Sequence, residues 1–488
     1  MTATATSQSS PPRQRTYGNW RQGRRPGLFG LGPLGTTAAF VVMICAAGSM
    51  ALSKWVAIGI AVAGVLVLAP LALRFQGRSG AQIMLSRLLW SWGRRRRQHI
   101  YLTGLASPVS ETHRLPGILA KSQLWEAETG LREPLGVVII PQSRHYTVAL
   151  RCQTEGMDLV DQEVVDQRVA RMGMLLSALC REPLLVQAQV IVDTTPDQGL
   201  ALAAEVNATT KEDAPPLAKT ILDEIVRTYP VGAAHVQTWA VLTFRPPTRG
   251  TWTDEAMCRE IATRLPHIVT GLLGAGASAV TPMSAADLAL TVSSAYDPVS
   301  AARAAVRIAP GWENAGPVAT QETWEHYRHD SAVSRTWGQM EAPRGVVYSS
   351  TFSRLAEPDP ALLRKRVAII YRPYSPGAAA VLVERDRKDA IFTANKKKQA
   401  TARDSVDIMA AEQAAHEEAT GAGIVRFTVL VTATVRDETA LEDAEALVLA
   451  RAGEARVALR TMYRTQAAAF AASLPTGVVL PTHASIPG

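Results

Sequence analysis

Cysteine is scarce in this chain of 488 residues. None of its four cysteines belongs to a C-x-x-C pair; they are Cys45, Cys152, Cys180 and Cys258. Zinc ribbons and disulfide-stapled folds need cysteines paired at short spacing, so the sequence excludes both classes and fits a reducing compartment. We therefore expect neither a disulfide framework nor a metal site.

Motifs for nucleotide binding and hydrolysis are also missing. The sequence has no G-x-x-x-x-G-K-[ST] motif and no Gly-Lys pair, although the lysine of that motif is what reaches the nucleotide phosphates. The Gly-rich stretch 271–276 follows a helical pattern, so it is interpreted as a helix end. No G-x-S-x-G or H-E-x-x-H motif occurs. The prediction is a non-catalytic protein without a cofactor.

Charge is nearly absent from residues 34–73, where Lys54 is the only charged side chain. One membrane-spanning helix needs ~20 apolar residues, so the run predicts a transmembrane hairpin of two helices that turns at residues 53–55. One span followed by a buried core helix is the alternative. A cleaved signal peptide fits poorly, because the apolar part is too long.

Arginine is concentrated on both sides of this run. The flanking arginines are Arg13, Arg15, Arg21, Arg24 and Arg25 before it, and Arg74, Arg78, Arg87, Arg94, Arg95, Arg96 and Arg97 after it. The positive-inside rule then predicts a two-pass plasma-membrane protein with both termini in the cytoplasm. Residues 1–33, rich in Ser, Arg, Gly and Pro, are predicted to be a disordered basic N-terminus.

Residues 74–134 are predicted to hold an interfacial basic helix and a linker. In the helix, over 79–92, Trp90 and Trp92 are expected at headgroup level. The run Arg94, Arg95, Arg96 and Arg97 follows it and is predicted to contact an anionic inner leaflet. The alternative is that these arginines only fix the topology.

From residue 135 onward, strand and helix patterns alternate. Residues 135–296 predict a first α+β lobe, 297–345 an irregular connector rich in Trp, Gly and Pro, and 346–488 a second α+β lobe with a long charged helix. The expected sheets are mostly antiparallel, and the second lobe suggests a ferredoxin-like order. The fold class is therefore α+β with an N-terminal transmembrane helical hairpin.

Two further stretches carry candidate functional side chains. His326 and His329 would share a helix face as metal ligands do, but no third ligand is marked, so a packing or partner-contacting role for Trp324 and Tyr327 is preferred. The basic stretch around lysines 396–398 lacks interleaved aromatic residues. A solvated helix face is therefore expected there, and no sequence-specific nucleic-acid binding.

Parts of the chain resemble actinobacterial membrane proteins of conjugative elements. These are similar to a PrgI-type two-span subunit joined to the N-terminal, non-ATPase region of the type IV secretion ATPase. The likeness is carried by the apolar hairpin, by the segment from Ala295-Tyr296-Asp297-Pro298 to Ser334-Arg335-Thr336-Trp337, and by the tail Tyr463-Arg464-Thr465-Gln466 with Ser473-Leu474-Pro475-Thr476-Gly477.

The resemblance implies a non-catalytic, membrane-anchored scaffold that docks a separate P-loop ATPase of a conjugative or type IV-like secretion machine. Other secretion subunits and further copies of the chain would be its other partners. Phe470 and Leu474 are the candidate ATPase-docking anchors. The alternatives are a membrane component of a type VII-like export system and, less favoured, a membrane-bound enzyme.

Overall fold

The computed structural model describes residues 32–50, 53–75, 77–104, 114–154, 160–196, 206, 208–211, 213–228, 234–299, 308–341, 343, 347–395 and 402–484. Residues 1–31, which make up most of the predicted disordered N-terminus, lie outside these ranges, as do lysines 396–398. Neither of those two predictions is therefore tested.

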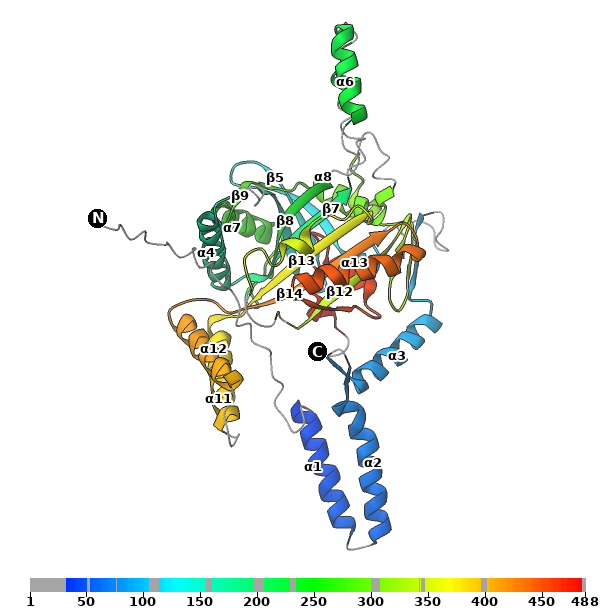
Figure 1. Ribbon diagram of the computed structural model, residues 1–488, viewed down its shortest axis with the longest axis vertical. Helices are drawn as coiled ribbons and strands as arrows, with labels where there is room; N and C mark the ends of the chain where they lie inside the picture. The colour runs from blue at the N-terminus through cyan, green and yellow to red at the C-terminus, as the bar shows by residue number, and fades with distance from the viewer. Residues whose placement is uncertain are drawn as a thin grey trace, which may run out of the picture.

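The described chain alternates strands and helices (Figure 1). The helices are α1 (Gly32–Ser49), α2 (Lys54–Ala72), α3 (Gly80–Arg95), α4 (Gln162–Cys180), α6 (Pro216–Thr228), α7 (Asp254–Gly274), α8 (Ala285–Tyr296), α10 (Ser353–Ala356), α11 (Pro376–Asn395), α12 (Ala402–Ala419), α13 (Leu441–Glu454) and α14 (Gln466–Ala472). The strands are β1 (Arg74–Phe75), β2 (Arg78–Ser79), β3 (Ile100–Leu102), β4 (Gln123–Glu128), β5 (Pro134–Ile140), β6 (His145–Thr154), β7 (Leu185–Pro196), β8 (Ala234–Phe244), β9 (Ala277–Pro282), β10 (Ala319–Glu322), β11 (Tyr327–His329), β12 (Ala332–Glu341), β13 (Arg364–Pro373), β14 (Val425–Val435) and β15 (Ala458–Thr461).

Thirteen of the described strands form one antiparallel sheet. Their order is β3-β10-β11-β12-β14-β13-β7-β8-β6-β5-β4, with β15 paired to β12 and β9 paired to β6. The predicted α+β class with mostly antiparallel strands is therefore confirmed. The two predicted lobes share this sheet and do not have separate ones.

Two units of the same topology make up the centre of the sheet. The first runs β6-α4-β7-β8-α7-β9 and orders its strands β9-β6-β8-β7; the second runs β12-α10-β13-β14-α13-β15 and orders them β15-β12-β14-β13. Both are the ferredoxin-like 4-1-3-2 arrangement. The sequence suggested it only for the second unit.

The two units join where β7 pairs with β13, the equivalent strand of each unit. Their register runs antiparallel from Lys365 opposite Thr194 to Tyr371 opposite Ala188. Equivalent strands that pair antiparallel relate the units by an approximate two-fold axis. The end of β7 then lies beside the start of β13, so the insertions that follow β7 and β13 leave the sheet at opposite ends.

Both faces of the sheet are covered, which explains the continuous apolar runs in its strands. On one face lie α4, α7 and α13; on the other lie α8, α14 and the segment after α14. Strand β13 shows the alternation, because Val367 packs on the α13 side and Ala368 on the α8 side. Strand β5 is buried from Leu135 to Ile140 for the same reason.

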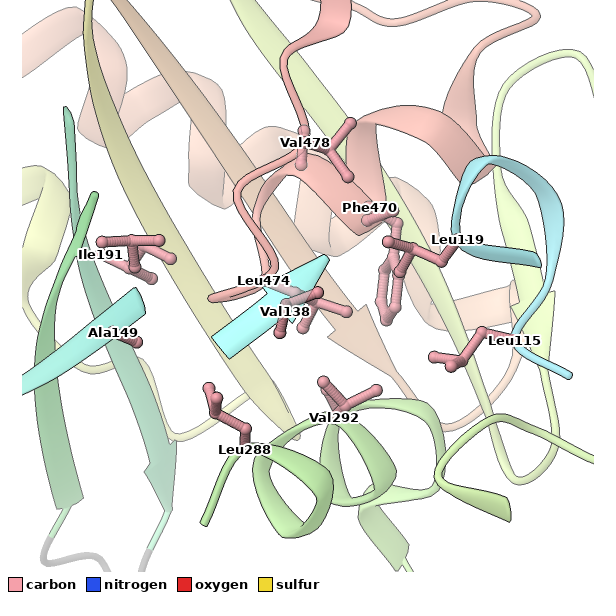
Figure 2. Packing of buried hydrophobic residues seen from close by; sticks show 14 of the residues in the cluster. Leu115, Leu119, Val138, Ala149, Ile191, Leu288, Val292, Phe470, Leu474 and Val478 are labelled. Carbon is pink, nitrogen blue, oxygen red and sulfur yellow. The ribbon is translucent and has the colours of Figure 1, made fainter. Parts of the chain in front are cut away.

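The C-terminal segment 466–480 crosses the face that α8 covers (Figure 2). Side chains of the sheet hold its backbone: Gln189 Nε2 donates to the Ala472 carbonyl at 2.7 Å, and Thr243 Oγ1 donates to the Gly477 carbonyl at 3.2 Å. Phe470 and Leu474 fill the core beneath it. The segment is thus an integral layer of the fold.

The predicted transmembrane hairpin is contradicted. Helices α1 and α2 pack against each other and project from the body (Figure 1), and Pro70 interrupts the backbone hydrogen bonding of α2. Across the described ranges, no helix combines the length and the apolar character needed to cross a membrane. The predicted two-pass localisation is corrected with it.

Other local predictions also need correction. The stretch 297–345, expected to be irregular, contains β10, β11 and β12, whose pairing with distant strands no local pattern reveals. His326 and His329 do not share a helix face, because His329 ends strand β11. The predicted helix end at residues 271–276 is confirmed, since α7 ends at Gly274.

Gly477 is required where the C-terminal segment crosses the sheet. Its φ is +64°, and a Cβ would lie well inside 3.0 Å of the Thr147 and Thr243 hydroxyl oxygens. We expect Gly477→Ala to lower the free energy of unfolding by about 2–4 kcal/mol, because it combines backbone strain with overpacking. Denaturant-induced unfolding measures the loss.

The control is Gly453→Ala in α13, where a Cβ meets no atom within 4 Å. Alanine there is expected to leave stability unchanged or to raise it by up to about 1 kcal/mol. Equal stability of the Gly477→Ala protein and the wild type would contradict the tight packing of the segment.

Candidate functional site

Helix α3 is the element for which the sequence predicts contact with a lipid surface. It begins with a capping box, in which Ser79 Oγ accepts from the Gln82 N–H at 3.3 Å and Gln82 Oε1 accepts from the Ser79 N–H at 3.1 Å. Large apolar side chains are exposed along it, namely Met84, Leu85, Leu88 and Trp92. Helix α3 therefore has an apolar face that no described residue covers.

An aromatic stack fixes α3 to the body. Trp90 meets Trp324 edge-on with ring centroids 6.0 Å apart, and Trp324 stacks on Tyr463 at 5.9 Å. The Arg464 N–H donates to the Trp324 carbonyl at 2.8 Å. Trp90 therefore points toward the body and not to a headgroup layer, and Trp324 contacts this chain's own helix.

The predicted arginine run lies at the C-terminal end of α3. Arg94 and Arg95 occupy the last turn, where the helix dipole favours cations, and Arg96 is the C-cap. The Arg96 guanidinium lies 3.8 Å from the centroid of the Trp92 ring. All four arginines, Arg97 included, are exposed. We call Met84, Leu85, Leu88, Trp92, Arg94, Arg95, Arg96 and Arg97 together the α3 surface.

The other predicted docking residues lie in the interior. Phe470 and Leu474 are 0% exposed, and Tyr327 is 2% exposed. Phe470 is surrounded by Tyr296, Tyr327 and His329, with ring centroids 5.0, 5.4 and 4.8 Å away. In this fold these side chains anchor the C-terminal segment to its own sheet and present no surface to a partner.

His329 is part of a buried hydrogen-bond chain in this cluster. Its Nδ1 lies 2.5 Å from the Tyr296 carbonyl, so Nδ1 carries the proton, and Nε2 accepts from Ser334 Oγ at 2.7 Å. Burial lowers the pKa of His329 to about 4, which keeps the ring neutral. Both ring nitrogens are thus occupied by protein groups, and His329 acts as a structural histidine.

Sequence reasoning missed a set of buried charges on β13. Arg364 binds Asp193 through both carboxylate oxygens, at 2.8 and 2.6 Å, and Lys365 pairs with Asp359 on the opposite face. Arg366 returns to the first face and lies with its guanidinium 4.5 Å from the Phe470 ring centroid. In the sequence, this set appears as three consecutive basic residues at the start of an apolar strand. The same pattern occurs where a strand end is exposed to solvent, so it does not by itself indicate burial.

Helix α6 is a second surface that no described residue covers. It lies in the insertion between β7 and β8, and none of its residues is buried. Leu217, Ile221 and Ile225 are 71, 51 and 45% exposed and, at spacings of four residues, form one apolar stripe. Figure 1 shows α6 projecting from the end of the body opposite to α3.

Two comparisons with known proteins bear on the chain. A family model described as Domain of unknown function (DUF8461) matches residues 24–82, a range that includes α1, α2 and the start of α3. No curated protein matches the chain. Neither result links it to conjugation or secretion, so that assignment is not carried forward. The resemblance to the N-terminal region of secretion ATPases stays a prediction.

Glu322 gives this region a pH dependence. Its Oε1 accepts from the Ala467 N–H at 3.0 Å, and burial raises its pKa from 4.5 to about 7. The folded chain therefore holds a proton that the unfolded chain releases between these pH values. Stability falls as pH rises through this window. We expect Glu322→Gln to remove this part of the pH dependence and to raise the melting temperature above pH 7.

Thermal unfolding between pH 5 and 8 measures the effect. Glu325→Gln, which removes an exposed carboxylate three residues away, is the matched control. If the pH profiles of Glu322→Gln and the wild type coincide, burial of Glu322 does not govern the stability of this region.

Proposed function

We propose that the chain is a non-catalytic docking scaffold that bridges an anionic lipid surface and a separate P-loop ATPase. One observation carries the proposal: the α3 surface and the α6 stripe lie at opposite ends of the body (Figure 1). Such an arrangement allows two partners to bind at the same time.

The α3 surface fits an anionic lipid surface in both chemistry and shape. Interfacial helices lie in the plane of a lipid surface, with apolar and Trp side chains toward the acyl chains and basic side chains beside the headgroups. Trp92 and Leu88 would supply the apolar contact, and the four arginines the charge. This contact is peripheral and requires no helix that crosses the membrane. The edge-on contact of Trp90 with Trp324 would hold the body in one orientation relative to the lipid surface.

The α6 stripe fits a helix-in-groove contact with a protein. In such contacts, apolar side chains on one face of a helix insert into a groove of the partner. Leu217, Ile221 and Ile225, at i, i+4 and i+8, lie on one face of α6 in this way. An isolated helix of 13 residues is marginal in water, so a covering partner would also stabilise it. We assign the ATPase to this surface because the candidate anchors Phe470 and Leu474 are buried.

Vesicle flotation tests the lipid contact. Replacing Arg94, Arg95, Arg96 and Arg97 by Gln is expected to weaken binding to phosphatidylserine-containing vesicles by about 1 kcal/mol per charge. The control has the same charge change elsewhere, with Gln at Arg227, Arg249, Arg328 and Arg354, which are exposed on other elements. Equal flotation of the two variants would contradict a lipid role for the α3 surface.

Co-purification tests the protein contact. The chain is co-expressed with the P-loop ATPase encoded nearest to its gene, and Leu217, Ile221 and Ile225 are changed to Ser. These side chains would become buried anchors in the complex, so the triple change is expected to abolish recovery of the ATPase. The control changes Leu131, Leu273 and Leu449 to Ser, which are exposed elsewhere. Equal recovery with both variants, or none with the wild type, would refute docking on α6.

A further inference from the structure

Arg366 is a buried cation that the protein leaves without a hydrogen-bond acceptor. The residue is 1% exposed, and within the described chain none of its three guanidinium nitrogens has a partner. An unpaired buried charge costs several kcal/mol, so such groups in folded proteins are almost always compensated.

The neighbours that would compensate Arg366 are engaged elsewhere. Asp193, directly across the β7–β13 ladder, is bound through both oxygens by Arg364. Thr432, directly across on β14, hydrogen-bonds Thr336 at 3.0 Å and Ser473 at 3.2 Å. The contact with the Phe470 ring is worth about 2 kcal/mol when desolvated, which is less than the cost of burial.

The electrostatic surroundings of the Arg366 guanidinium also disfavour its charge. Burial first, and the nearby Arg364 second, lower the pKa of Arg366 to about 9, although Asp193 and Tyr296 act against the shift, so the guanidinium stays charged at neutral pH. A guanidinium has five N–H donors and no acceptor, so the buried Arg366 side chain calls for an acceptor.

We propose that Arg366 is the binding residue of an internal site for a small monovalent inorganic anion, of the size of chloride. A single negative charge matches the single uncompensated positive charge. The close packing of Phe470, Tyr296 and Ala368 around this face favours a monatomic anion over a phosphate. By binding there, the anion would fasten α14 and the C-terminal segment to the sheet.

The test is thermal unfolding of the full chain in chloride titrations at constant ionic strength, with gluconate as the replacing anion because it is too large for such a site. The wild type is expected to show a saturable rise in melting temperature with chloride. Arg366→Met is expected to lose this response while remaining folded, because an apolar side chain of similar length suits the site. Arg366→Lys, which keeps the charge, should retain part of the response.

The control is Arg354→Met, which removes an exposed arginine and should keep the wild-type response. A direct readout is bromide in place of chloride in crystals, with an anomalous peak expected beside the Arg366 guanidinium. A wild type without a saturable response, or an equal response in Arg366→Met or Arg366→Gln, would overturn the proposal. So would an anomalous map with no peak at this position.

Discussion

The antiparallel pairing of β7 with β13 is the constraint on which the rest of the structure depends. It joins two ferredoxin-like units through their equivalent strands and makes one sheet from two. Because β7 ends where β13 begins, it also sends the α6 insertion and the α11–α12 insertion to opposite ends of the molecule (Figure 1). The ladder therefore decides at which end of the molecule the α6 stripe lies, whereas the contact of Trp90 with Trp324 holds α3 against the body.

The same ladder concentrates charge in the interior. Strand alternation puts Arg364 and Arg366 on the face covered by α8 and α14, and Lys365 on the face covered by α13. Arg364 and Lys365 each form an ion pair with a carboxylate, whereas Arg366 has no hydrogen-bond partner among the described residues and packs on the Phe470 ring. The C-terminal segment thus covers the polar part of the sheet. This accounts for the Gln, Thr and Ser side chains beneath it, which bind its backbone and each other.

The failed predictions of membrane and partner contact share one cause. Apolar composition was interpreted as membrane or partner contact without knowledge of what covers it. In the tail, Phe470 and Leu474 face the chain's own sheet. In residues 34–73, the two predicted helices form, but no helix of the described residues has the length and apolar character to cross a membrane. For Trp90 and Trp324 the partner turned out to be each other, across more than two hundred residues of sequence.

Local pattern determined much of this protein. The helix at residues 79–92 and the alternation of strands and helices from residue 135 onward were recognisable, because such patterns act between residues close in sequence. The exposed arginines that follow α3 were likewise recognisable from the chain alone. Strand order, the fusion of the two units, the burial of Arg366 and the placement of the C-terminal segment were decided only by tertiary structure. They depend on contacts between residues far apart in the sequence, such as Thr194 with Lys365 and Gln189 with Ala472, and no local propensity encodes which strand will be the neighbour.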